Sequence, residues 1–376
     1  MPLNIKIGEP FKLSDQYGCF PQITKLQNGD VFVAFNTGAD RVPDGNEDAR
    51  IANEEPQLIK AETILDNNRK YLNDLSVSNY LASWALKSTD GGKSFHDWGI
   101  RSIYLSESDT GVVGIGSHVY RGNKKYIKIY RSKDGCGSWD GPEYAEYTGP
   151  PTDNKKKENN SWSIIISRSA IRLPDGSSII SAYGRFEGDN FDRTFILKTT
   201  DNFKSLYYYA TIACVGAAKE SSNYNEPVMS FTADGKTLIC VMRTEGFSPI
   251  VICRSVNYGA TWSPPEYAGA DGVFPDLCLL QNGVMACSYG RPDVAIMFSD
   301  DDGRFFRYRK MIYHMPEYQK PQSCCYTGIR EIAPNRLLMV FSAPDGLILK
   351  PDSNNPWHNL KDYRIYGVTI DVEKVE

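Results

Sequence analysis

Short apolar runs separated by polar turns recur along this chain. Val31-Phe32-Val33-Ala34-Phe35 follows the turn Gln27-Asn28-Gly29, and Ile179-Ile180-Ser181-Ala182-Tyr183 follows the turn Pro174-Asp175-Gly176. Runs of this length, bounded by Gly, Pro, Asn or Asp, predict strands and not helices. The same frame recurs at Phe231–Gly235, Leu280–Gly283 and Ile332–Asn335. The pattern therefore predicts a series of antiparallel strand pairs.

A second repeat follows most of these pairs. Its frame has eight positions: a hydroxyl residue, any residue, Asp or Asn, any residue, Gly, any residue, a small polar residue and an aromatic, and two of the copies match it more loosely. The Asp or Asn side chain can bond the backbone of the turn, and Gly accepts positive φ. The copies span residues 88–95, 132–139, 199–206, 255–262 and 299–306. Five copies in one chain indicate a repeat architecture.

The spacing of the copies indicates the fold class. Blades of a β-propeller repeat every 40 to 50 residues or so, and insertions in loops lengthen the period. Each unit here contains two strands joined by a turn, a loop, and two more strands joined by the Asp turn, which makes one four-stranded antiparallel blade. First strands are predicted near residues 20–26, 164–173, 225–231, 274–280 and 325–332, and a less regular unit covers Gly111 to Trp139. We expect an all-β, six-bladed β-propeller of four-stranded antiparallel blades, one domain over residues 1–376.

The chain ends and one insertion complete this prediction. The alternating stretch Tyr363–Ile370 is expected to pair with the N-terminal segment Ile5–Leu13 and close the ring, which removes exposed strand edges. Residues 38–79 form a loop insertion in the first blade, in which residues 57–74 have the apolar spacing of a short helix. Long loops of this kind are often lids, so we expect the insertion to overhang the mouth of the ring.

Composition narrows the classes of function. Aromatic residues make up 12% of the chain, with 31 Gly and 21 Pro, as expected for many short strands joined by turns. The net charge of −4 argues against a nucleic-acid partner, and no apolar run is long enough to span a membrane. The four histidines and nine cysteines show no metal-ligand spacing, so neither a metal nor another cofactor is expected. The N-terminal residues lack the apolar core of a signal peptide, which is consistent with a cytoplasmic protein or with a secreted one whose signal has been removed.

The repeated turns on a six-bladed ring resemble the Asp-box (BNR) repeats of the sialidase (neuraminidase) superfamily. The resemblance implies that the Asp boxes lie on the rim and that the chemistry lies where the inner strands line a central funnel. Glu226, in Asn225-Glu226-Pro227, matches the glutamate that polarises a tyrosine nucleophile in that family, and Tyr326 stands where this nucleophile is expected. Arg243 and Arg291 resemble the second and third members of the arginine triad. A phenol with a pKa of about 10 needs such a carboxylate to take its proton.

Two parts of the sialidase pattern do not match. The first triad arginine is absent, and Gln22 or Pro21 stands in its place, which weakens a three-way clamp on a carboxylate. The general acid is assigned to Asp40, after the second strand of the first blade, or to Glu187, at the corresponding place in the third blade.

Further polar side chains are predicted to meet the substrate. Arg185, Arg243 and Arg291 each follow the second strand of successive blades and are expected to form a cationic ring. His118, in the second blade, is a candidate substrate ligand or general base.

These residues favour a sialidase-like glycoside hydrolase that cleaves a terminal, acidic sugar from a glycan. Related propellers act on arabinan or on uronate-containing polysaccharides; in them Glu226 and Glu187 would act as the base or nucleophile and the acid. A polysaccharide lyase is the first alternative, with His118 or Tyr326 as the base and the arginines neutralising a uronate carboxylate. The second alternative is a non-catalytic glycan-binding propeller, since fold alone does not fix function.

Overall fold

The computed structural model describes residues 2–37, 58–73, 82–121, 124–152, 164–215, 223–244, 249–315, 325–345 and 363–375. Within these ranges the chain is nearly all β, with one helix, and almost every strand pairing is antiparallel. The all-β prediction is therefore confirmed. In the part of the chain that the structure describes, no helix is long and apolar enough to cross a membrane.

Strands that follow one another in sequence pair in order. The first sheet contains β3 (Cys19–Lys25), β4 (Val31–Thr37), β6 (Ala82–Ser88) and β7 (His96–Trp98). The next two groups are β8 (Leu105–Ser108), β9 (Gly111–Arg121), β10 (Lys124–Ser132) and β11 (Ser138–Thr148), and β12 (Ile165–Ile166), β13 (Ile171–Arg172), β14 (Ser178–Gly184), β15 (Arg193–Thr199) and β16 (Ser205–Ala213). A short parallel pairing of β11 with β16, at Glu146 to Thr148, joins these two groups into one sheet.

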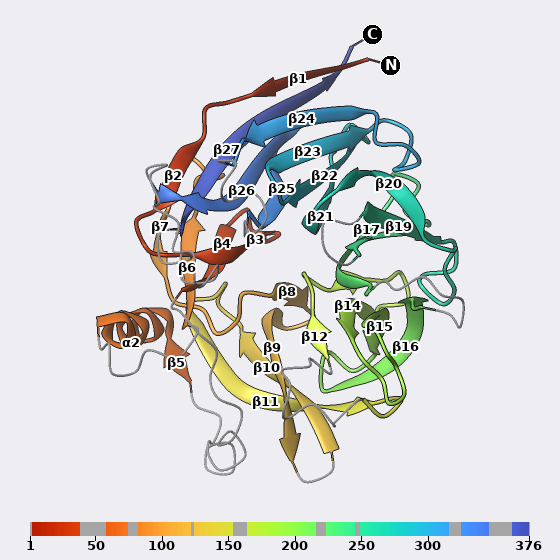
Figure 1. Cartoon of the computed structure of the whole chain (residues 1–376). Helices are drawn as coiled ribbons and strands as arrows, with labels where there is room; N and C mark the ends of the chain where they lie inside the picture. The colour runs from red at the N-terminus through yellow and green to blue at the C-terminus, as the bar shows by residue number, and fades with distance from the viewer. Residues whose placement is uncertain are drawn as a thin grey trace, which may run out of the picture.

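Three more sheets follow in the same manner. They contain β17 (Asn225–Phe231), β18 (Leu238–Arg243), β19 (Pro249–Ser255) and β20 (Glu266–Asp271); β21 (Val273–Leu279), β22 (Met285–Gly290), β23 (Val294–Ser299) and β24 (Tyr308–Tyr313); and β25 (Thr327–Ala333), β26 (Arg336–Pro344) and β27 (Tyr363–Lys374) with β1 (Leu3–Ile7) and β2 (Phe11–Ser14). Figure 1 shows the sheets arrayed around the centre of the molecule, toward which β3, β8, β12, β17, β21 and β25 lie.

The apolar patterning follows from the position of each strand within its sheet. β22 and β23 are buried at every position because both of their faces are covered by neighbouring sheets. The outer strand β20 instead reads Glu266-Tyr267-Ala268-Gly269-Ala270-Asp271, in which only the two alanines are buried. Continuous apolar runs thus predict middle strands, and alternation predicts outer ones.

The hydrophobic core is divided into clusters that lie between neighbouring sheets. One joins β21–β23 to β25–β27, another joins β17–β19 to β21–β23, and a third joins β3, β4 and β6 to β26 and β27. Of the other three clusters, one lies between the sheet of β3–β7 and the strands β8–β11, the next between β8–β11 and β12–β16, and the last between β12–β16 and the sheet of β17–β20. Each sheet is therefore stabilised by apolar contact with both of its neighbours.

The repeated turns share one set of hydrogen bonds. In the first, Ser88 Oγ donates to Asp90 Oδ1 (2.8 Å) and accepts from Gly92 N (2.8 Å), while Ser94 N donates to Asp90 Oδ1 (3.0 Å). The Ser94 hydroxyl also donates to Asp90 Oδ2 (2.6 Å). This bond, together with those from the Ser94 backbone and the Ser88 hydroxyl, holds the pKa of Asp90 below its usual range. Equivalent bonds occur in the turns around Asp134, Asp201, Asn257 and Asp301. The copies at residues 199–206 and 299–306, which match the sequence frame least well, thus have the same local structure as the others.

The two chain ends pair with each other. Leu3 to Ile7 pair antiparallel with Ile370 to Lys374, and Phe11 to Ser14 pair with residues 365–367. The predicted pairing of the N-terminal segment with the last strand is therefore confirmed. The two strands lie side by side at one edge of Figure 1.

The described part of the first-blade insertion lies at the periphery. The predicted helix is present as α2 (Ala61–Asn73), preceded by β5 (Ile59–Lys60), which pairs with the outer strand β11. Ile64 and Leu65 are buried in the cores on either side of the first sheet, and α2 contacts β6 and β7. The expectation that this insertion overhangs the centre is wrong for these residues because their apolar face packs outside the first sheet (Figure 1). Residues 38–57 lie outside the described part of the chain.

Candidate functional site

The central strands begin with an unusual backbone conformation that recurs from sheet to sheet. Phe20, Arg168, Glu226 and Phe274 have φ values of 55°, 66°, 51° and 50°, in the left-handed region that non-glycine residues rarely adopt. Register shifts in the pairings of β3, β17 and β21 with their neighbours occur at this same place. Backbone strain of this kind, about 1–3 kcal/mol per residue, is typical of functional sites.

Glu226 is the carboxylate of this group. It is 7% exposed, and its Oε2 accepts a hydrogen bond from the backbone N–H of Phe274 (3.0 Å) and lies 3.2 Å from Arg243 Nε. Arg243 Nε also donates to Asn225 Oδ1 (2.7 Å). Because Asn225 pairs with Arg243 at the end of the first two strands of the sheet, the ladder places the acid and the cation together.

Three aromatic rings from the beginnings of β3, β21 and β25 pack together, and one of them belongs to Phe274, whose N–H bonds Glu226. Tyr326, which directly precedes β25, lies 4.7 Å from both Phe20 and Phe274, measured between ring centroids. Phe20 and Phe274 are 6.3 Å apart in an edge-on arrangement. Tyr326 is 5% exposed, so its ring is fixed by packing while the Phe274 peptide touches Glu226. The structure thereby connects Tyr326 and Glu226 through one residue, Phe274.

Two further tyrosines belong to this neighbourhood. Burial raises the pKa of Tyr104 to about 12, and the negative charge of Glu226 also raises it. Burial raises the pKa of Tyr183 well above its ordinary value, and Glu226 adds to this shift while Arg243 opposes it. Both phenols therefore stay protonated at neutral pH and keep a hydrogen that can be donated. The sequence reasoning did not find them, although Tyr183-Gly184-Arg185 repeats as Tyr289-Gly290-Arg291.

The three predicted arginines differ in their partners. Arg185 Nε donates to Asp192 Oδ1 (2.7 Å), so its charge is balanced within its own sheet, as that of Arg243 is by Glu226. Arg291 is half-buried and directly follows β22. Gly290 lies so close to the Cys325 backbone that an added Cβ would be 1.7 Å from its carbonyl oxygen. Arg291 therefore comes from the strand end nearest to Tyr326.

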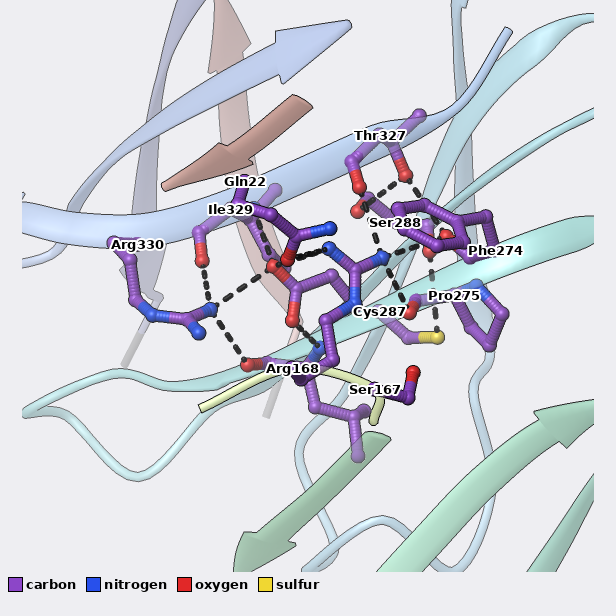
Figure 2. A network of polar contacts seen from close by, with 12 residues as sticks. Gln22, Ser167, Arg168, Phe274, Pro275, Cys287, Ser288, Thr327, Ile329 and Arg330 are labelled. Atoms are coloured by element: carbon purple, nitrogen blue, oxygen red, sulfur yellow. Dashed lines mark hydrogen bonds and ion pairs between the residues drawn. The ribbon is translucent and has the colours of Figure 1, made fainter. Parts of the chain in front are cut away.

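Gln22 lies beneath this surface. It is 4% exposed, and its Oε1 accepts a hydrogen bond from Arg168 Nη1 (2.9 Å). Figure 2 shows Arg168 at the middle of a polar network that joins several central strands. We therefore assign Gln22 to this network and not to the surface that would meet a substrate.

The remaining predicted residues are more dispersed. Glu187 is exposed on the connection between β14 and β15, where its N–H donates to Pro151 O (2.8 Å). His118 lies on the part of β9 that runs past β8, and its Nδ1 is 2.9 Å from Ile164 O. Asp40 lies outside the described residues. Among the residues that the structure does describe, no group of three His, Cys, Asp or Glu side chains is placed to hold a metal ion.

The turns and the candidate site lie at opposite ends of the strands. In the first sheet, Cys19 pairs with Asn36 near the beginning of β3, whereas Val31 pairs with both Lys25 and Ser88 at its other end. The turn that starts at Ser88 is thus a strand length away from Phe20. In this sheet the repeated turn consequently lies away from the candidate site.

Sequence comparison finds no family model and no curated protein that match this chain. Solved structures do match. A protein of unknown function from Dyadobacter fermentans is 17% identical, with a TM-score of 0.64, over 98% of this chain and 99% of that one. An intramolecular trans-sialidase from Ruminococcus gnavus, in complex with oseltamivir carboxylate, is 11% identical (TM-score 0.57; 98% and 97% covered). An α-L-arabinofuranosidase from Fusarium graminearum, in complex with an iminosugar inhibitor, is also 11% identical (TM-score 0.56; 97% and 96% covered).

These similarities establish the general fold. Likeness over nearly the full length of both chains shows that this chain has a propeller-like, nearly all-β fold of the kind found in sialidases and arabinan-cleaving enzymes. Identity at this level says nothing of the substrate, since one fold supports many functions.

Proposed function

We propose that this protein is a glycoside hydrolase that acts on a glycan at the surface where its central strands begin. The observation that carries the proposal is Glu226: a nearly buried carboxylate on a strained residue, fixed by Arg243 and by the peptide of Phe274, whose ring packs against that of Tyr326. Buried carboxylates with partners of this kind are typical of catalytic sites. The fold, which is shared with glycoside hydrolases, agrees with this proposal.

The proposed architecture is a closed, six-bladed propeller with Asp-box turns. The apolar clusters between successive sheets and the pairing of β1 with β27 support closure of the ring. The five equivalent turns have the hydrogen bonds that the Asp-box pattern requires, with Asn257 in place of Asp in one of them.

The proposed mechanism uses Tyr326 as the nucleophile. Its oxygen attacks the anomeric carbon of the terminal sugar while the phenolic proton passes to Glu226 and the bond to the leaving oxygen breaks. Asp40 or Glu187 is the proposed acid that protonates the leaving oxygen. In the second step water attacks the anomeric carbon and gives one proton to this residue, while the bond from the sugar to Tyr326 breaks and Glu226 returns the phenolic proton to Tyr326. Tyr104 and Tyr183 are additional donors for the sugar hydroxyls.

Arg291, at the strand end nearest to Tyr326, is the proposed ligand of an acidic sugar. Arg185 forms an ion pair with Asp192 and Arg243 with Glu226, which balances these two charges of the cationic ring expected from the sequence. An acidic sugar would bind with its carboxylate toward Arg291, because bidentate guanidinium pairing is strong. A neutral sugar requires only the tyrosine and backbone donors.

A lyase is the second candidate, favoured by the environment of His118. If the Ile164 carbonyl accepts the Nδ1–H, then Nε2 is the unprotonated nitrogen of the neutral ring and is suited to abstract a proton. A screen of acidic and neutral aryl glycosides and of polysaccharides separates the two reactions. A hydrolase releases aglycone and reducing sugar, and a lyase forms an unsaturated product that absorbs in the near ultraviolet. If neither signal appears with any substrate, the proposal of catalysis is wrong.

A further inference from the structure

Arg168 is a charged residue buried among the central strands, where an apolar side chain could fill the same space. It is 2% exposed and extends from the third group of strands toward the central strands of three other sheets (Figure 2). Nη1 donates to Gln22 Oε1 (2.9 Å), and Nη2 donates to the carbonyl oxygens of Phe274 (2.9 Å), Pro275 (2.8 Å) and Thr327 (2.9 Å). One side chain therefore fixes β3, β21 and β25 relative to each other.

The contact of Arg168 with Phe274 connects Arg168 to Glu226. The guanidinium carbon of Arg168 lies 4.0 Å from the centre of the Phe274 ring, and Nη2 holds the Phe274 carbonyl. The N–H of the same residue donates to Glu226 Oε2. Because Phe274 has a φ of 50°, which its side chain disfavours, its orientation depends on contacts of this kind. Arg168 thus supports the donor that orients the carboxylate.

The contact of Arg168 with Thr327 connects Arg168 to Tyr326. Thr327, whose carbonyl accepts from Arg168, is the residue directly after Tyr326, and the Tyr326 ring packs against Phe274. Thr327 is further fixed by a hydroxyl contact with Ser288 (2.9 Å). The backbone next to Tyr326 and the ring against which it packs are therefore held by one guanidinium.

The network is costly, which argues against a purely structural role. Burial lowers the pKa of Arg168 although Asp276 lies 3.6 Å away, because a buried cation loses its hydration. Within the described residues, Arg168 Nε and Gln22 Nε2 are buried without a hydrogen-bond partner. Apolar residues of similar volume often stabilise a core as well as or better than such a network, so its retention favours a role in positioning.

We propose that Arg168 is a positioning residue that sets the distance and orientation between Glu226 and Tyr326 through Phe274 and Thr327. This inference rests on the proposed function for its catalytic consequence but not for its structural one. Arg330 provides the matched control. It is a half-buried arginine that donates to the same Asp276 (2.9 Å), and its described contacts are with Asp276, Leu277 and Ile329 and not with Phe274 or Thr327.

The test compares Arg168→Met with Arg330→Met by two measurements. Hydrogen exchange at the Phe274 amide, read by mass spectrometry of short peptides, reports its bond to Glu226 without any need for activity. We expect Arg168→Met to exchange this amide about tenfold faster or more, and Arg330→Met to leave it within about threefold of wild type. On an active substrate, Arg168→Met should lower kcat about tenfold or more with KM nearly unchanged, and Arg330→Met should leave kcat within about threefold.

Each outcome decides a separate claim. Unchanged Phe274 exchange in Arg168→Met, or equal effects in the two variants, overturns the positioning role. If Arg168→Met does not fold, Arg168→Lys replaces it: a single ammonium cannot reach Gln22 and the three carbonyls together, so the same exchange and kcat effects are expected. A wild-type protein that is inactive on every substrate overturns the proposed function, and amide exchange then still decides the role of Arg168.

Discussion

The rings of Phe20 and Tyr326 pack with their centroids 4.7 Å apart and their planes inclined by 31°, although Phe20 comes from the first sheet and Tyr326 from the last. The contact places an apolar ring on the strand where the sialidase resemblance calls for an arginine. It links the first and last repeats of the chain at the candidate site. The side chain that fixes Tyr326 from that direction is therefore aromatic and uncharged.

We predict that Phe20→Leu loosens Tyr326 and lowers kcat about three- to tenfold, with a loss of stability of about 1 kcal/mol, because an aromatic pair contributes about that much beyond its buried area. Steady-state kinetics and urea denaturation measure the two effects. Phe305→Leu, at a ring that is 63% exposed, is the control and should change neither. An unchanged kcat in Phe20→Leu would show that this packing does not position the tyrosine.

We predict that Glu226→Gln lowers activity a hundredfold or more, on the order of 3 kcal/mol in the activation barrier, because the amide cannot take the proton of the nucleophile. Glu266→Gln is the matched control, since Glu266 forms its ion pair with Arg254 on an exposed outer strand. Thermal denaturation of both variants separates catalysis from folding. Activity of Glu226→Gln within a few-fold of wild type would remove Glu226 from the mechanism.

We predict that Tyr326 carries the covalent intermediate. Tyr326→Phe should lower activity a hundredfold or more, whereas Tyr183→Phe and Tyr104→Phe, which lose only a donor to the sugar, should lower it about tenfold. A fluorinated sugar that traps the intermediate, followed by peptide mass spectrometry, identifies the labelled residue. Tyr267→Phe, at a 61% exposed position, is the control. A label on Tyr183 or Tyr104 would reassign the nucleophile.

We predict that removal of residues 1–13 lowers the thermal midpoint by about 5 °C or more. The deletion removes β1 and most of β2, exposes the edge of β27, and takes Leu3 and Ile5 from the core between the last two sheets. Calorimetry of the deletion and of a control that lacks only residues 1 and 2 measures the effect. An unchanged midpoint would contradict a stabilising role for this pairing.

We predict a pH-dependent stability that originates at Lys125. Its side chain is 6% exposed, hydrogen-bonds the Thr152 hydroxyl and lies over the Tyr120 ring, and burial lowers its pKa to about 7. Between about pH 7 and its unfolded value near 10.4 the unfolded chain binds more protons than the folded one, so stability rises with pH. Below about pH 7 Lys125 is charged in both the folded and the unfolded chain, so the full cost of burying its charge lowers the free energy of unfolding.

The comparison of wild type with Lys125→Met isolates this effect. The difference in unfolding free energy, wild type minus variant, should increase by on the order of 1 kcal/mol per pH unit between pH 7 and pH 10. Urea denaturation at pH 7, 8.5 and 10 measures it, and the shared titrations of other groups cancel in the difference. A difference that stays constant with pH would show that Lys125 keeps its ordinary pKa.

The sequence was sufficient to predict the strands and the turns because both depend on local pattern. The apolar run of β4 and the Asp90 turn were predicted from single residue types at fixed spacing. The contact of Glu226 with Arg243 is of the same local kind, since the two residues lie at the ends of paired strands. Features of this kind need no knowledge of how the sheets pack.

The centre could not be predicted in the same way. Arg168 contacts residues that are more than a hundred positions away in the sequence and belong to three other sheets, and a local sequence pattern cannot predict such contacts. Gln22 was set in the place of an arginine that would contact the substrate, because the position of a residue along a strand does not tell how deeply its side chain is buried. The insertion helix was identified by its apolar spacing, but that spacing does not specify on which side of the first sheet it packs.

The separation of the repeated turns from the candidate site has a practical consequence. The turn around Asp90 can carry a dye, a linker or a solid support a strand length from Phe20 at the beginning of β3, so immobilised protein would keep that surface open to long polymeric chains. Equivalent turns in other sheets offer further attachment points on the same side. Orientation on a sensor chip can therefore be chosen from one end of the strands, and glycan arrays can be presented to the other.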